Sequence, residues 1–263
     1  MGSVKRYLEQ VQADEERYEW IEENVDFNIV PGDPEWIEME KLYEKRLMEG
    51  SLSELANGNS WLLEEEIEWS KTNPHSVAYQ DFCNQIERLD DLMGDSPDSM
   101  QQKIRFSYVV TLMESCLSEM LKSITLSSEE LKGNALTKVH GLKDSTIKVS
   151  QLLNTNSNEL IEKTIINYLA SLIYHNIVAI VNVYQNILNV KLDNLEDGIL
   201  GKIKEATTLR HDIVHRNGKK ASGEENEITK EIIDGHIENI NTLIDVIYEY
   251  INVNIPQEDE PEF

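Results

Sequence analysis

The sequence is poor in cysteine and has no long apolar segment. Cys83 and Cys116 are its two cysteines, too few for the disulfide framework of a secreted domain, so both are expected to be reduced thiols in or near a core. No uninterrupted apolar run reaches the roughly 18 residues that a membrane-spanning helix needs, and no signal-peptide pattern is present. Arg6 stands where N-myristoylation requires Ser or Thr. These absences predict a cytoplasmic protein without a membrane anchor.

Strand-like alternation and internal repeats are also missing, whereas apolar residues recur at helical spacing along much of the chain. Amphipathic patterns of this kind cover residues 104–124, 200–214 and 229–251. Residues 160–190 are apolar over much of the helical circumference, which predicts one helix at the buried centre of a bundle. The sequence therefore predicts an all-α fold.

Basic residues are scarce, and their distribution is uneven. The chain has 24 Lys and Arg against 49 Asp and Glu, a formal net charge of −25. This charge disfavours broad affinity for nucleic acids, because phosphate contacts supply most non-specific binding. Residues 1–100 hold 25 of the acidic and 8 of the basic side chains, a net charge of −17, whereas residues 200–220 have a net charge of +4. We call residues 200–220 the basic island, and it suits a few phosphates better than a long duplex.

Composition divides the chain into three parts. The first part contains all four tryptophans and 24 of the 49 acidic residues, and Pro and Gly residues interrupt it. We expect residues 1–97 to form a small acidic helical domain, residues 98–255 a helical bundle, and residues 256–263 a disordered acidic tail.

The segment that carries the most chemistry is LRHDIVHRNG, residues 209–218, which lies inside the basic island. It places Arg210, a fixed cation with a fork of donors, five positions before His215, a side chain that exchanges protons near neutral pH. Asn217 and Gly218 tolerate left-handed backbone and predict that a helix ends there. An arginine with a nearby histidine provides the groups that phosphodiester cleavage requires.

The spacing separates these two side chains on a regular helix. Positions five apart differ by about 140° around the helix axis, whereas His211 and His215, four apart, share a face. For Arg210 and His215 to meet at one phosphate, the helix must fray or tighten near His215, or a second chain must supply one of the two groups. The pattern therefore predicts a homodimer.

The order of Arg210 and His215 resembles the R-x4-6-H signature of the HEPN superfamily of helical ribonucleases, and residues 210–218 resemble its RiboL-PSP-type branch. The resemblance extends over residues 99–254, where Glu114 and a later apolar run stand where that family has its earlier helices. It implies a HEPN-like bundle, endoribonuclease activity, two motifs that face each other across a homodimer, and a defence or toxin role in prokaryotes.

We therefore predict a metal-independent endoribonuclease that needs no cofactor. His215, as a neutral imidazole, takes the proton of an RNA 2′-OH, and Arg210 stabilises the charge on the non-bridging phosphate oxygens. His211 orients His215 or serves as the acid, and the acid could equally come from the second subunit. The products are a 2′,3′-cyclic phosphate and a 5′-OH, and DNA is refractory. The predicted RNA-binding cations are Arg216, Lys219, Lys220, Lys202 and Lys204.

The same residues also have structural interpretations. His211 and His215 could act only as cations at a helix C-terminus. Asp212 and Arg216, four positions apart, predict a surface ion pair. Glu114 and Asp212 are secondary candidates for the site, and Glu114 equally fits a pairing with an arginine of the bundle.

Other functions remain open. Residues 211–215, HDIVH, are close to the HExxH of zinc proteases, but Asp is shorter than Glu, the helix ends directly after the second histidine, and Arg210 and Arg216 would place cations beside the metal. A non-catalytic helical module that binds RNA or a protein is the alternative function from a class other than enzymes.

The charge of residues 1–97 predicts a domain that restrains the nuclease, by covering the basic island or by binding a regulatory protein. The alternative is a solvated face that keeps the chain soluble.

Overall fold

The computed structural model describes residues 36–43, 60–94, 98–147, 156–192, 198–220 and 222–255, together with Arg17 and Ile21. The regular structure of these residues is helical throughout, and their one β-interaction is an isolated bridge between Lys219 and Glu225. The predicted all-α fold is therefore confirmed. No helix in the described part of the chain is long and apolar enough to cross a bilayer. The expected tail 256–263 lies outside the described residues.

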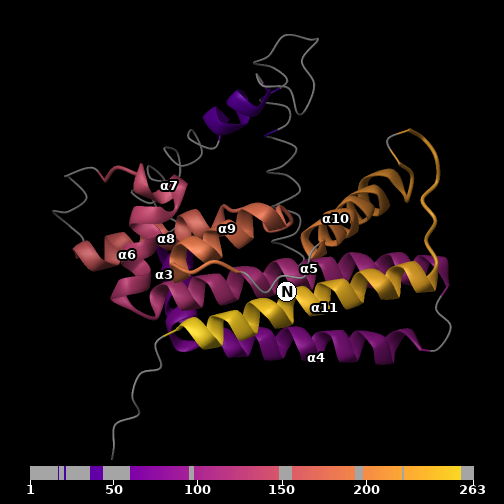
Figure 1. Ribbon diagram of the computed structural model, residues 1–263, viewed down its shortest axis with the longest axis horizontal. Helices are drawn as coiled ribbons and strands as arrows, with labels where there is room; N and C mark the ends of the chain where they lie inside the picture. The colour runs from indigo at the N-terminus through magenta and orange to yellow at the C-terminus, as the bar shows by residue number, and fades with distance from the viewer. Residues whose placement is uncertain are drawn as a thin grey trace, which may run out of the picture. The chain divides into compact units, whose positions relative to one another are not determined.

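Three of the described helices run side by side along the molecule in Figure 1, namely α4 (His75–Met93), α5 (Ser99–Leu126) and α11 (Lys230–Asn254). α5 packs against both of the others, and its Phe106 and Met113 are completely buried. The start of α5 is fixed by a capping box, because the Asp98 side chain accepts from the Gln101 N–H and the Gln101 side chain accepts from the Asp98 N–H.

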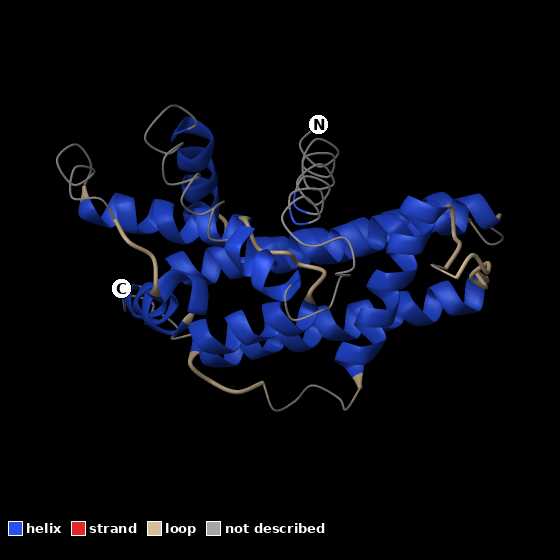
Figure 2. Cartoon of the chain, turned by 90° about the horizontal axis from the view of Figure 1, so that it is seen from above, coloured by secondary structure: helices blue, strands red, loops and turns tan. Residues whose placement is uncertain are grey.

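Shorter helices lie on this layer or on one another, and Figure 2 shows the helical arrangement from above. They are α6 (Glu129–Lys138), α7 (His140–Lys143), α8 (Ser157–Ala170), α9 (Ile177–Leu188) and α10 (Ile199–Arg216). Among their contacts, α8 packs on α5, α9 packs on α6, and α10 packs on α5, α9 and α11. The candidate site is therefore carried by a helix that three other helices hold in place.

The prediction of one helix over residues 160–190 was wrong, because the chain leaves the helix between α8 and α9. The Tyr174 side chain in this connection is buried, and its hydroxyl donates to the Leu169 carbonyl oxygen at 2.9 Å. Asn176 then caps α9 by accepting from the Ala179 N–H. Both helices are apolar enough for the interior, so their periodicity alone does not reveal the break.

The chain divides by its contacts into two compact units, Met1–Trp61 and Leu62–Phe263. The second unit contains the candidate site and begins well before residue 98, the expected start of the bundle. It includes α4, because Phe82 and Ile86 of this helix belong to the same hydrophobic core as α5.

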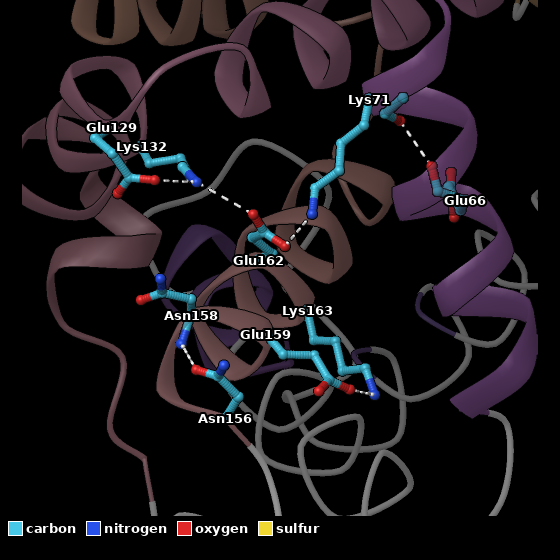
Figure 3. A network of polar contacts seen from close by, with 10 residues as sticks. Glu66, Lys71, Glu129, Lys132, Asn156, Asn158, Glu159, Glu162 and Lys163 are labelled. Carbon is cyan, nitrogen blue, oxygen red and sulfur yellow. Dashed lines mark hydrogen bonds and ion pairs between the residues drawn. The ribbon is translucent and has the colours of Figure 1, made fainter.

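Ion pairs join α3 (Ser60–Thr72) to the bundle, and Figure 3 shows the region. At its centre, Glu162 of α8 accepts from the Lys71 ammonium group of α3 at 2.6 Å and from the Lys132 ammonium group of α6 at 3.1 Å. Lys122 of α5 pairs in the same way with Glu66 of α3. Charged side chains thus connect α3 directly to α8 and α5, and through Glu162 to α6.

Candidate functional site

α10 carries residues 200–216 of the basic island and ends where Asn217 and Gly218 predict. The helix continues through Arg216, and Asn217 and Gly218 then adopt positive φ values of 54° and 90°. The Gly218 N–H donates to the Asp212 carbonyl oxygen at 2.8 Å, which closes the helix end. A Cβ atom at Gly218 would lie 3.2 Å from the Lys103 ammonium nitrogen of α5, so this end of α10 is closely packed.

His211 and His215 form an exposed pair of imidazoles on one face of α10. Their ring centroids are 4.7 Å apart, and the ring planes are inclined by 38°. Partial burial of the ring, together with the nearby His215 and Arg216, lowers the pKa of His211. His211 is therefore neutral at pH 7, and a neutral imidazole can accept a proton or a hydrogen bond.

Arg210 is half-buried and lies on a different flank of α10. On a regular helix it is about 100° from His211 and about 140° from His215 around the axis. Because α10 stays helical through Arg216, neither fraying nor tightening near His215 brings the two side chains together within one chain. The contribution of a second chain stays a prediction.

Asp212 holds the end of α10 rather than facing the imidazoles with a free carboxylate. Its side chain is buried, Oδ1 accepts from the Arg216 guanidinium group at 2.7 Å, and Oδ2 accepts from the Asn226 side-chain amide at 2.9 Å. Burial by itself would raise the pKa of Asp212, but the hydrogen bonds from Asn226 and Arg216 outweigh it and the pKa is lowered. The pairing with Arg216 is as predicted, but its position is not, because the carboxylate is buried and not on the surface.

Glu114, the other secondary candidate, lies in α5 and pairs with a histidine. Its carboxylate is buried, and Oε1 is 3.5 Å from Nδ1 of His175 in the connection before α9. The Lys103 ammonium group donates to the Asn217 carbonyl oxygen at 3.3 Å, so the end of α10 lies beside Lys103. Glu114 is eleven residues, or about 16 Å, further along α5. Glu114 and His175 are therefore separate from the imidazole pair.

The predicted RNA-binding cations lie at different places along the site. The four lysines among them are all exposed, namely Lys202, Lys204, Lys219 and Lys220. Lys204 shares a face of α10 with His211, since a separation of seven residues is almost two full turns. Lys202 is farther from the imidazoles, about 20 Å from His215 along the helix axis. Lys103 is a further cation beside the site that the sequence analysis missed. It comes from α5, and nothing in its own segment indicates that contact.

A metal site has no geometric support in the described residues, where no group of three His, Cys, Asp or Glu side chains is placed to hold an ion. The HDIVH segment has the spacing of two zinc ligands, but the carboxylate between them is bound to Arg216 and Asn226. Asp212 is thus not available as the base of such a site.

Comparison with known proteins gives no match to a family model, to a curated protein or to a solved structure.

Proposed function

We propose that this protein is a metal-independent endoribonuclease whose active site is formed by Arg210, His211 and His215. The observation that carries the proposal is the imidazole pair, with ring centroids 4.7 Å apart, exposed at the end of a helix. The pair belongs to the basic island, in a chain whose net charge is −25. Two imidazoles with adjacent cations provide proton transfer and charge stabilisation, which are the two requirements of phosphodiester cleavage by an internal 2′-OH.

In the proposed reaction His215 accepts the proton of the 2′-OH, and the 2′ oxygen attacks the adjacent phosphorus. The bond from phosphorus to the 5′ oxygen breaks, and that oxygen takes up a proton from an acid. Arg210 stabilises the negative charge on the non-bridging oxygens. The lowered pKa of His211 favours its neutral form, so we assign His211 to orienting His215 and the acid to a group of the second subunit.

A homodimer is part of the proposal, because Arg210 and His215 point to different sides of one regular helix. α5 offers an apolar surface for the second copy next to the site, where Met100 and Ile104 are 60% and 55% exposed. Ile104 directly follows Lys103, whose ammonium group contacts the end of α10. Docking along this surface places the α10 ends of both copies near the interface, where Arg210 of one protomer can complement His215 of its partner.

RNA as the substrate favours a cytoplasmic location, and the resemblance to HEPN ribonucleases favours a defence or toxin role. The rival function is a non-catalytic helical module, which the strongly negative charge favours. Asp212 does not separate the two, because it has a structural role in both.

Incubation of the purified protein with end-labelled RNA in excess chelator separates these functions. The expected result is cleavage that leaves 2′,3′-cyclic phosphate and 5′-OH ends, with no cleavage of DNA of the same sequence. Binding of RNA without cleavage at any protein concentration would support the module instead. Cleavage that appears only after zinc is added would support a metal site.

A further inference from the structure

Residues 217–220 and 222–226, which follow α10, lie in a short hairpin, which we call the 217–226 hairpin. Lys219 and Glu225 face each other in an antiparallel bridge. The Asn226 N–H donates to the Gly218 carbonyl oxygen at 2.9 Å. The hairpin thus begins at the left-handed end of the helix and returns to it.

The two arms of this hairpin carry opposite charges that lie close together. Lys219 and Lys220 on the first arm are exposed, and so are Glu224 and Glu225 on the second. Lys220 Nζ is 3.9 Å from Glu224 Oε2, and Lys219 faces Glu225 in the bridge. The first arm begins only a few residues after His215, so the position of the hairpin decides how near its ammonium groups, which attract phosphates, and its carboxylates, which repel them, come to an RNA strand at the imidazoles.

A partly buried side-chain contact holds this hairpin against α10. Asp212 of α10 is 5% exposed, and one of its oxygens accepts from the Asn226 amide while the other accepts from Arg216. Asn226 is the last residue of the hairpin, so its side chain ties the acidic arm back to the helix. A hydrogen bond to a charged group, shielded from water, is stronger than one on the surface.

We propose that Asn226 is a positioning residue of this nuclease, which holds the 217–226 hairpin so that Lys219 and Lys220 bind phosphates of the RNA strand beside His215. The inference rests on the proposed function and deepens it, because it assigns phosphate contacts to one element. Asn226 acts through Asp212 and touches no substrate itself.

The test measures binding of a short mixed-sequence RNA with 2′-O-methyl groups, which the proposed reaction cannot cut. Fluorescence anisotropy over a range of salt concentrations gives the slope of log affinity against log salt. For a single strand, each phosphate that the protein neutralises contributes about 0.7 to the magnitude of this slope. Lys219→Ala and Lys220→Ala are each expected to reduce the slope by about this amount. Asn226→Ala is expected to reduce both slope and affinity although it removes no charge.

Ser222→Ala is the matched control, because Ser222 is exposed on the same hairpin, and it is expected to keep the wild-type slope. Asn226→Gln retains the amide donor and is expected to recover part of the affinity. Amide hydrogen exchange of residues 219–226 provides a second measurement that needs no RNA. Exchange is expected to become faster in Asn226→Ala and to stay unchanged in Ser222→Ala.

A wild-type slope and wild-type exchange in Asn226→Ala would overturn the inference, as would an equal reduction in Ser222→Ala. Wild-type protein that does not bind the 2′-O-methyl RNA would overturn it as well. Failure of the proposed function gives a different result: the wild-type protein binds the 2′-O-methyl RNA, Asn226→Ala weakens that binding, and unmodified RNA is not cut.

Discussion

The exposed imidazole of His215 can be removed without disturbing the core of the bundle. His215→Ala is expected to reduce RNA cleavage at least about 100-fold, because a general base contributes about that factor. The free energy of unfolding should change by no more than about 0.5 kcal/mol, since surface substitutions have small effects. Arg210→Lys keeps the charge but loses the forked donor geometry, and it should also reduce cleavage strongly. Single-turnover assays and urea denaturation measure the two quantities.

His140→Ala is the control for this pair, because His140 is exposed in α7, outside the site. It should leave cleavage unchanged. Cleavage near the wild-type rate by purified His215→Ala would mean that His215 is not the base.

His211 should titrate below the ordinary histidine pKa of about 6.5. Partial burial of its ring is the main cause, and repulsion by a protonated His215 and by Arg216 adds to it. The folded state therefore holds this proton less tightly than the unfolded state. The resulting contribution to stability is complete above about pH 6.5 and is lost as the pH falls below that value.

The measurement is an NMR titration of the imidazole ring protons. His215→Gln removes one of the repelling charges and is expected to raise the pKa of His211, though not fully to the ordinary value, because burial remains. A His211 pKa at or above about 6.5 in the wild-type protein would argue against its neutral role at pH 7.

At the scale of helices, the ion pairs of α3 predict a measurable coupling between this helix and the bundle. Glu162→Gln leaves Lys71 and Lys132 without the carboxylate that lies between them, and Lys132 is largely buried. The expected decrease is about 1 to 3 kcal/mol of unfolding free energy, less than for a fully buried pair because Lys71 is partly exposed. Urea denaturation at neutral pH measures this decrease.

Glu129→Gln is the matched control, because Glu129 contacts the same Lys132 but its side chain is 83% exposed. Its effect should stay within about 0.5 kcal/mol. Burial by itself would raise the pKa of Glu162, but its bonds to Lys71 and Lys132 lower it overall. Its stabilising contribution is therefore present above the ordinary Glu value and is lost as the pH falls through the lowered pKa. Equal effects of the two substitutions would show that burial of Glu162 is unimportant.

At the scale of the whole molecule, the proposed active site requires two chains. Ile104→Glu places a charge on the apolar surface beside the α10 end, and it is expected to shift the protein from dimer to monomer and to abolish cleavage. Val253→Glu is the control, since Val253 is 81% exposed near the opposite end of α11, and it should leave the dimer intact. Light scattering gives the mass, and a monomeric wild-type protein that cuts RNA would refute the two-chain site.

The restraining role expected for residues 1–97 stays a prediction, because most of this segment lies outside the described residues. The segment includes α4, whose Phe82 and Ile86 are part of the core of the 62–263 unit. A deletion up to residue 97 would thus remove core as well as charge. Raising the salt concentration, which screens the charge but leaves the core in place, is the better way to examine this role.

The helical fold and the end of the helix that bears the site are both predictable from local sequence. They depend on residues close together in the chain: apolar spacing along one helix, and the tolerance of Asn217 and Gly218 for positive φ. The pairing of Asp212 with Arg216 is predictable for the same reason, because four residues bring two side chains together on any helix.

The meeting of groups far apart in the chain depends instead on tertiary packing. Asn226 binds Asp212, Lys103 binds the end of α10, and His175 lies beside Glu114. Periodicity does not encode these contacts, because they depend on how helices and loops distant in sequence pack together. The break between α8 and α9 has the same origin, since burial of Tyr174 and its bond to Leu169 favour a turn within a run that is apolar enough for one helix.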